Sequence, residues 1–362
     1  MTNFTNSLTL KQICRRYRGK SVVSDLNLEL FGSQITCLLG PSGCGKSTTL
    51  RVAAGIEKQD SGDVYMSGNL VSNSKNVHVE PEFRSVGLMF QDFALFPHLT
   101  IIENVIFGIK YQGKKKEIHN RAVNLLDRVN LLDSLQKYPH MLSGGEQQRV
   151  ALVRAIAPKP KVMLMDEPFS GLDNRLRDEI RDQTLALLKE EGTAVLLVTH
   201  EPDEAMRMAD TIALMRDGTI IQEAAPYNIY NKPKDALVAS FFSDVNILTG
   251  TVSQSRIETS FGWFITPGIE DGTSVEILIR PQHLKIDFDR NGNGPNPTSE
   301  DGVPARGTVF RARFMGKESL VELIMDADES KLKATIPGVF LPAFGTPLWL
   351  SMRRDRCFVF KK

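Results

Sequence analysis

Cysteine is scarce in this sequence, and long hydrophobic runs are missing. The four cysteines, Cys14, Cys37, Cys44 and Cys357, are scattered, with no CxxC pair and no nearby histidine at ligand spacing. This pattern argues against a disulfide framework and a zinc site, so we expect reduced thiols. No apolar run reaches the roughly 18 residues needed to span a bilayer, and the charged start is not followed by the apolar stretch of a secretory signal. We therefore expect the chain to remain in the cytoplasm.

An excess of either charge is also missing. The 362 residues carry a formal net charge of +1, which gives no reason to expect a broadly basic surface for nucleic acid. No acidic tail is present either. A chain of this length is longer than a single hydrophobic core usually serves, so we expect at least two domains. The partners of the protein must therefore be inferred from local sites.

Short apolar runs alternate with longer helical patterns in residues 1–240, which indicates an α/β domain with a mainly parallel sheet covered by helices. We expect strands at 34–39, 162–165 and 193–199. Residues from about 92 to 157 are predicted to form a helical insertion, because 121–129 places apolar residues at helical spacing.

The pattern changes in the C-terminal part of the chain, residues 241–362. Short β-rich runs such as 275–279 and 320–325 are separated by turns of glycine, proline and asparagine, which predicts a small all-β domain. Residues 291–302 are rich in glycine, proline and polar side chains, so they are expected to form a loop.

A glycine-rich loop follows the first expected strand. Residues 40–47 read GPSGCGKS and match GxxxxGK[ST] between a strand and a helix that begins near Thr48, the context this motif requires. Glycines let backbone N–H groups converge on phosphate oxygens, and the helix N-terminus adds the positive end of its dipole. We expect Lys46 to neutralise the β- and γ-phosphates of ATP and Ser47 to bind Mg²⁺; the alternative is a plain strand–helix turn with a solvent-facing lysine. The residues expected to bind the nucleotide are Gly40, Pro41, Ser42, Gly43, Cys44, Gly45, Lys46, Ser47 and Thr48, with the Cys44 thiol itself a bystander.

Two neighbouring carboxylates, Asp166 and Glu167, follow the expected strand 162–165. Adjacent residues at a strand end cannot easily play the same role. Asp166 is predicted to hold Mg²⁺, possibly through water, and Glu167 to polarise an attacking water as a general base; capping of the next helix is the alternative. His200 ends the strand at 193–199, and the carboxyl ends of parallel strands share the edge where ligands bind. These residues predict nucleotide hydrolysis.

A second anion-binding helix start is predicted at Ser143, Gly144, Gly145 and Glu146, within LSGGEQQR. A serine and two glycines before a helix, which we expect to run from Glu146 to about Ala155, suit a γ-phosphate. The alternative is a turn with an N-cap serine.

At this point the sequence resembles the ATP-binding cassette (ABC) family, whose signature is LSGGQ; Glu146 stands where glutamine is common. Tyr17 matches the aromatic residue that stacks on adenine, and Gln91 matches the Q-loop glutamine, which assists the water and Mg²⁺. Asp173, at the end of SGLD, matches the D-loop, and His200 matches the switch histidine. The matches occur in family order over residues 1 to about 240.

The resemblance implies a homodimer in which the signature of one subunit closes over ATP held by the phosphate loop of the other. It also implies that Gln91 and the helical insertion contact integral-membrane permease subunits. The side chains expected at that contact are Phe93, Leu95, Phe96, Pro97 and His98, although packing in the core is an equal alternative.

The C-terminal part of the chain indicates which class of ABC ATPase the sequence resembles. The segments IRPQHL (279–284) and FMGKES (314–319) resemble landmarks of the OB-like accessory domain on ATPases of bacterial binding-protein-dependent importers. We therefore predict a peripheral ATPase at the cytoplasmic face of the inner membrane, linked indirectly to a solute-binding protein, with a regulatory or dimerisation role for the accessory domain. Residues 91–98 look most similar to those of ferric-iron importers, with polyamine, sugar or other anion importers as the alternative.

An ABC ATPase can instead be a soluble enzyme that acts on nucleic acid or ribosomes. The C-terminal part lacks interleaved basic and aromatic residues, so we expect no nucleic acid partner.

Overall fold

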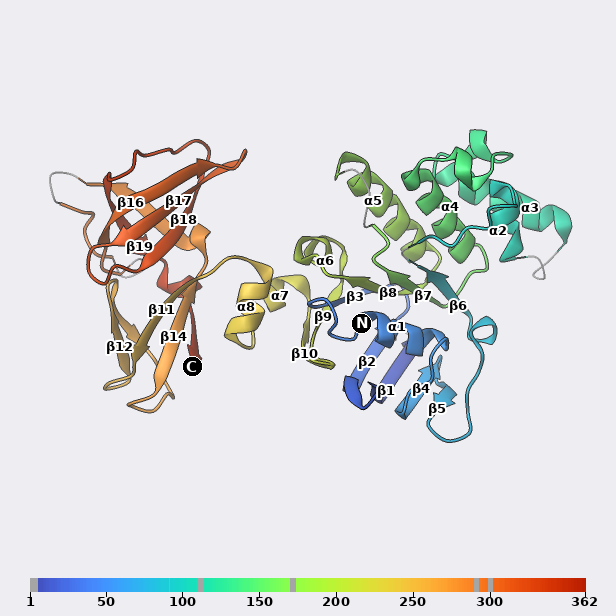
Figure 1. The fold of residues 1–362 in the computed structure, drawn as a ribbon, viewed down its shortest axis with the longest axis horizontal. Helices are drawn as coiled ribbons and strands as arrows, with labels where there is room; N and C mark the ends of the chain where they lie inside the picture. Colours follow the sequence, from blue (N-terminus) through green and yellow to red (C-terminus); the bar gives the residue numbers. More distant parts are fainter. Residues whose placement is uncertain (1–5, 91, 110–113, 170–173, 290–292, 299–301) are drawn as a thin grey trace. The chain divides into compact units, whose positions relative to one another are not determined.

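The computed structural model describes residues 6–90, 92–109, 114–169, 174–289, 293–298 and 302–362. The chain divides into two compact units, Met1–Lys232 and Pro233–Lys362 (Figure 1). The division falls eight residues before the boundary drawn from the sequence at residue 240. Helix α8 (Ala236–Phe242) accounts for the difference, because it contacts β14 (Ser274–Ile279) of the second unit. None of the helices in the described residues combines the length and the apolar composition that a bilayer span requires.

A six-stranded sheet forms the centre of the first unit. Its core strands are buried along their whole length, and such continuous apolar runs are typical of a parallel sheet that is covered on both faces. The expected strands at 34–39, 162–165 and 193–199 are confirmed, each within one residue. All neighbours pair in parallel except the antiparallel edge strand β10. The order across the sheet is β10 (Thr219–Ala224), β9 (Thr211–Arg216), β3 (Ile35–Leu39), β8 (Ala194–Thr199), β7 (Val162–Asp166) and β6 (Val86–Met89).

A second, antiparallel sheet lies in the same unit and was not anticipated from the sequence. Its order is β2 (Lys20–Phe31), β1 (Asn6–Tyr17), β4 (Ser61–Met66) and β5 (Asn69–Asn73). Shifts in register break the alternation of buried and exposed residues along β1, which hides the period-2 signal. Helix α1 (Lys46–Ala54) contacts β7 and β8 of one sheet and β1 and β2 of the other. The phosphate loop is thus anchored between two sheets.

The helices of the first unit include a group that follows β6. Helix α3 contains the periodic segment 121–129 almost entirely and buries Ala122, Leu125 and Leu126, as the spacing predicts. Figure 1 shows α2, α3 and α4 gathered together, and α2 contacts both of the others. Besides α1, the α-helices of this unit in the described residues are α2 (Ile101–Phe107), α3 (Lys115–Arg128), α4 (Gly144–Ile156), α5 (Asn174–Glu190), α6 (Pro202–Met208) and α7 (Pro226–Asn231).

The second unit is built mainly of β-strands around its own hydrophobic core, as the sequence predicts. The expected runs at 275–279 and 320–325 lie within β14 and β17 (Glu318–Met325). One sheet has the order β15 (Leu284–Phe288), β19 (Pro347–Met352), β16 (Ala305–Phe314), β17 and β18 (Lys331–Pro337). The others are β11 (Asn246–Thr251), β14 and β20 (Phe358–Lys361), and the hairpin β12 (Arg256–Thr259) with β13 (Gly262–Ile265).

Candidate functional site

The glycine-rich loop between β3 and α1 has the backbone that its glycines permit. Gly43 and Gly45 have φ of 79° and 109°, values that favour glycine. A Cβ on Gly45 would lie 2.5 Å from the carbonyl oxygen of Val22, whereas a Cβ on Gly43 would meet no atom within 4 Å. The loop is therefore packed tightly on its inner side and open at Gly43, where Pro41 and Ser42 are also exposed. This form fits a phosphate group that approaches the backbone.

Lys46, the first residue of α1, is buried and is held by the loop itself. Its Nζ donates hydrogen bonds to the carbonyl oxygens of Gly40, at 2.7 Å, and Pro41, at 3.0 Å. The ammonium group is thereby fixed at the start of a helix, where the dipole also favours an anion. The neighbouring Cys44 thiol is buried, and burial raises its pKa, so the thiol is not activated as a nucleophile. Thr48, in the first turn of α1, is half-buried.

Ser47 and Asp166 bring two oxygen donors together from different elements. The Ser47 hydroxyl, on the first turn of α1, donates to Oδ1 of Asp166, at the end of β7, at 3.2 Å. Burial raises the pKa of Asp166 above its ordinary value, partly offset by the Ser47 hydrogen bond, and Glu167 raises it further. Hydroxyl and carboxylate oxygens are ligands that Mg²⁺ prefers. The pair therefore fits a magnesium ion beside the phosphate loop.

Glu167 and His200 come together from the ends of two neighbouring strands. The His200 Nδ1 lies 2.8 Å from Oε1 of Glu167, and His200 directly follows β8. The Glu167 backbone N–H donates to the carbonyl oxygen of Val198 at 3.0 Å, which fixes this residue at a φ of 47°. A left-handed conformation is uncommon for glutamate and is typical of functional sites. The sequence prediction that the two residues share one edge of the sheet is thus confirmed.

The predicted second helix start is present, but two residues earlier than expected, because α4 begins at Gly144. Ser143 is its N-cap. The Ser143 N–H and O–H donate to Oε2 of Glu146 at 2.8 and 2.7 Å, and the Glu146 N–H points back to the Ser143 hydroxyl at 3.4 Å. These hydrogen bonds lower the pKa of Glu146. A Cβ on Gly144 would meet no atom within 4 Å, and Gly145 is half-buried, so this helix start is accessible.

Tyr17, the last residue of β1, keeps an exposed ring with a fixed orientation. Its hydroxyl donates to Oε1 of Glu57, and the guanidinium carbon of Arg15 lies 4.7 Å from the ring centroid. Arg15 also forms an ion pair of 2.9 Å with Glu57. Tyr17 as a whole is 38% exposed, so it can offer surface to a flat ligand. Sequence reasoning missed Arg15 and Glu57, because they hold Tyr17 in place but belong to no recognisable motif.

Two predicted site residues, Gln91 and Asp173, lie outside the described residues. The segment after Gln91 is described, and none of the five side chains expected at a membrane contact is fully buried, which counts against the alternative of core packing. Phe96 packs on Phe107 with ring centroids 4.6 Å apart.

Two residues that sequence reasoning missed hold this segment. Arg154, on α4, donates to the carbonyl oxygens of Ala94 and Phe93 at 2.6 and 2.9 Å. The Asn104 amide, on α2, accepts from the Phe96 N–H and donates to its carbonyl oxygen. Arg154 stands eleven residues after Ser143, or about three helical turns, so both lie on one side of α4. This spacing could have shown that Arg154 faces the same side as the signature serine, but not which atoms it binds. Its partners are backbone atoms, which leave no mark in a sequence.

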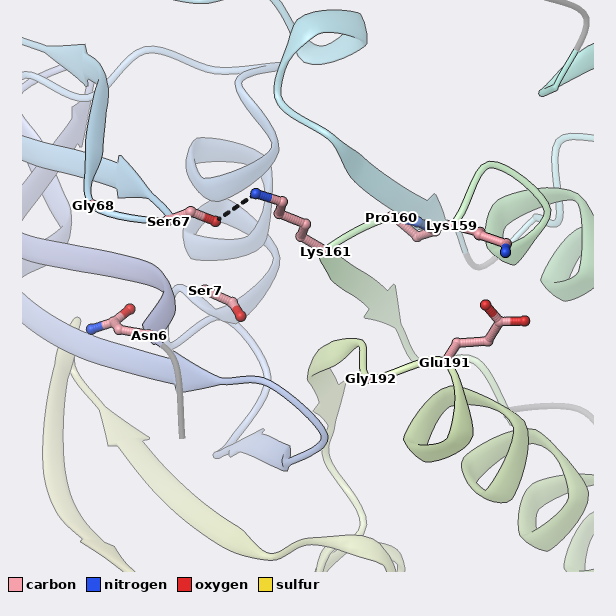
Figure 2. A pocket seen from close by; sticks show the side chains of 9 residues that line it. All are labelled: Asn6, Ser7, Ser67, Gly68, Lys159, Pro160, Lys161, Glu191 and Gly192. Carbon is pink, nitrogen blue, oxygen red and sulfur yellow. Dashed lines mark hydrogen bonds between the residues drawn. The ribbon is translucent and has the colours of Figure 1, made fainter. Parts of the chain in front are cut away.

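A separate cavity of about 670 Å³ lies at the other end of β7 (Figure 2). Lys161, which precedes β7, reaches across it to the Ser67 hydroxyl at 3.4 Å, and Lys159 and Glu191 also line it. Because Asp166 ends the same strand, this cavity is not part of the site described above.

Comparison with known families gives two matches. Residues 23–170 match the ABC transporter family, and residues 277–360 match the TOBE domain. The first match contains the phosphate loop, the start of α4 and both carboxylates at the end of β7. The second lies in the all-β unit and supports its OB-like fold.

Individual proteins of known name match over most of the chain. The spermidine/putrescine import ATP-binding protein PotA of Shigella dysenteriae serotype 1 (strain Sd197) is 38% identical over 87% of this chain and 83% of its own length. PotA of Vibrio cholerae serotype O1 is 35% identical, over 87% and 84%. Among solved structures, the ATP-binding cassette MJ0796, dimeric and bound to ADP and Pi after hydrolysis, matches with a TM-score of 0.54 and 30% identity, over 60% of this chain and 98% of that one. The similarity thus extends well beyond short motifs.

Proposed function

This chain belongs to the ABC transporter family as the ATPase subunit of an importer, and from that membership we propose that it drives the import of polyamines. Hydrolysis of ATP by this subunit is coupled to transport across a membrane.

Polyamines are favoured as cargo by the relatives, whose names specify spermidine and putrescine import. The ferric-iron prediction made from residues 91–98 finds no support among them. The physical reason is that an importer ATPase never touches its cargo, so the sequence around its permease contact has no chemical need to encode it. Full-length similarity is therefore a better guide to cargo than one short run.

The residues at the carboxyl edge of the sheet would act on ATP in distinct roles. Lys46 and the backbone of the loop would bind the β- and γ-phosphates. Ser47 and Asp166 would hold Mg²⁺, which neutralises phosphate charge when bound. Glu167 would polarise the attacking water as general base, and His200, 2.8 Å away, would orient that carboxylate. Tyr17 would offer its ring to adenine.

A homodimer would complete the site. Ser143 and Gly145 open α4, a helix start separate from the phosphate loop, and the dimeric state of the MJ0796 cassette supports a partner that supplies it in trans. Gln91 and Asp173 would complete the same interface. Two copies that close on two nucleotides would move the attached membrane subunits.

The assembly would place this subunit at the cytoplasmic face of a bacterial membrane. Its direct partners would be the permease subunits, contacted by the segment that Arg154 and Asn104 hold, and a solute-binding protein would deliver polyamine on the far side. The import function in the names of the relatives supports this arrangement.

The observation that carries the proposed ATPase role is the meeting of Lys46, Ser47, Asp166, Glu167 and His200 at one edge of one sheet, whereas the cargo rests on the relatives. The test is transport by the chain together with its permease and binding protein in proteoliposomes. We expect ATP-dependent uptake of labelled spermidine or putrescine, with no uptake of ferric iron. Uptake of iron alone would contradict the cargo, and co-purification with nucleic acid without need of a membrane protein would favour the soluble ABC ATPases.

A further inference from the structure

Two helices of the first unit begin with nearly the same hydrogen-bonded cap. At α2, the Thr100 N–H and O–H donate to Oε2 of Glu103, both at 2.8 Å, and the Glu103 N–H returns to the hydroxyl at 3.4 Å. At α4, the corresponding distances between Ser143 and Glu146 are 2.8, 2.7 and 3.4 Å. Such capping boxes stabilise helix starts. A capping box with a hydroxyl-bearing N-cap residue therefore occurs both at the signature segment and away from it.

At α4 the cap occupies the donors that a phosphate would need. The Ser143 N–H and O–H both point to a single carboxylate oxygen of Glu146. A γ-phosphate held by this helix start needs hydrogen-bond donors at the same place. The carboxylate also carries a negative charge, which repels a phosphate at close range. Glu146 and the phosphate of the partner's ATP thus compete for Ser143.

We propose that Glu146 acts as an internal competitor of the γ-phosphate and so sets the ATP concentration at which two copies of the chain close. This inference rests on the proposed function, because it needs the start of α4 to meet a nucleotide. Glu146 is a positioning residue in this role, since it acts through the donors of Ser143.

The surroundings of Glu146 offer its carboxylate a second position. Arg149 follows it by three residues on α4, so the two side chains are neighbours on the helix surface, and Arg149 and Lys137 are the cationic groups whose charge acts on Glu146. The Arg149 Nε is buried and makes no hydrogen bond within the described part of the chain. The positive charge of Arg149 would therefore attract a carboxylate displaced from Ser143.

The strength of the competition depends on charge. Hydrogen bonds to an ionised carboxylate are roughly twice as strong as neutral ones. Glu146→Gln keeps the size of the side chain and its ability to cap the helix, but it removes the negative charge. The variant should release Ser143 to a phosphate more readily and should no longer repel it.

The experiment measures ATP-dependent dimerisation by light scattering in the Glu167→Gln background, where hydrolysis does not deplete the complex. We expect Glu146→Gln to lower the ATP concentration for half-maximal dimerisation by at least about threefold. Glu103→Gln is the matched control: it weakens the same cap on α2 and should leave that concentration unchanged. Thermal melting of both variants separates a general loss of stability from the specific effect.

The possible results are distinct. An unchanged or higher ATP requirement in Glu146→Gln, with dimers still formed by the parent, would overturn this inference alone. An equal decrease in Glu103→Gln would also overturn it, because the effect would then belong to helix stability. If the parent formed no dimer at saturating ATP, the proposed function would fail together with the inference.

Discussion

Arg154 donates a hydrogen bond of 2.6 Å to the carbonyl oxygen of Ala94, and this contact ties the signature helix α4 to the segment that follows Gln91. Ala94 and its neighbour Phe93 have φ of 45° and 60°, conformations that need support from their surroundings. Arg154 therefore links this segment directly to α4.

Arg154→Ala should loosen residues 93–100, because it removes both hydrogen bonds to the strained backbone. The measurement is hydrogen exchange of that segment, which we expect to become faster by about tenfold or more, a change of about 1.4 kcal/mol in local opening. Arg128→Ala on α3, which removes an exposed ion pair with Glu190 of α5, is the control and should not alter the segment. Unchanged exchange in Arg154→Ala would show that Asn104 alone holds it.

Glu167→Gln should retain ATP binding and lose at least about 100-fold in turnover, because a neutral amide is a poor general base. Steady-state phosphate release and nucleotide titration measure the two properties separately. Glu82→Gln, at an exposed position, serves as the control. Turnover at the wild-type rate in Glu167→Gln would remove this residue from the base role.

Lys46→Ala should weaken binding of ATP about tenfold to 100-fold, since hydrogen bonds to charged groups contribute about 1.5–3 kcal/mol. The carbonyl oxygens of Gly40 and Pro41 would also lose their donor, so the melting temperature should be recorded. Titration with a fluorescent ATP analogue measures affinity. An affinity equal to that of the wild type, in a folded variant, would refute the phosphate-binding role.

Gly45→Ala should destabilise the protein more than Gly68→Ala. Both glycines have positive φ, 109° and 79°, so each alanine costs about 1–2 kcal/mol in backbone strain. Only at Gly45 would the new Cβ approach another atom closely, the carbonyl oxygen of Val22 at 2.5 Å, which adds about 1–3 kcal/mol. Urea unfolding of the two variants measures the difference. Equal losses would mean that the loop adjusts without cost.

Asp166→Asn should raise the melting temperature at neutral pH while it weakens Mg²⁺-dependent ATP binding. Burial raises the pKa of Asp166, so the folded protein holds this proton more tightly than the unfolded chain does. The ionised carboxylate therefore reduces stability at any pH above its folded pKa, and protonation at lower pH removes that penalty. The gain from Asp166→Asn should accordingly disappear in acid.

Melting curves from acid to neutral pH test this dependence, with exposed Asp133→Asn as the control. A gain that is equal at all pH values would contradict the role of charge burial.

Much of the site could be predicted from the sequence because its residues lie within short motifs at strand ends. The loop at 40–47, the pair Asp166 and Glu167, and His200 each follow a buried apolar strand, and parallel strands bring such ends to one edge. The β-rich secondary structure of the C-terminal unit was also predictable, because turn residues separate its short apolar runs. The antiparallel sheet of β1, β2, β4 and β5 was missed, because register shifts disturb the alternation on which strand prediction depends.

Local residue order specifies the chemistry of this protein: backbone conformations that only glycine adopts easily, a lysine at a helix start, and carboxylates after a buried strand. Which groups those residues meet depends on the folded arrangement of the chain. Arg154 reaches the carbonyl oxygens of Phe93 and Ala94 across some sixty residues of chain, and Ser47 reaches Asp166 across 119. Such contacts depend on backbone atoms and on the packing of distant elements, and neither leaves a pattern in the order of residues.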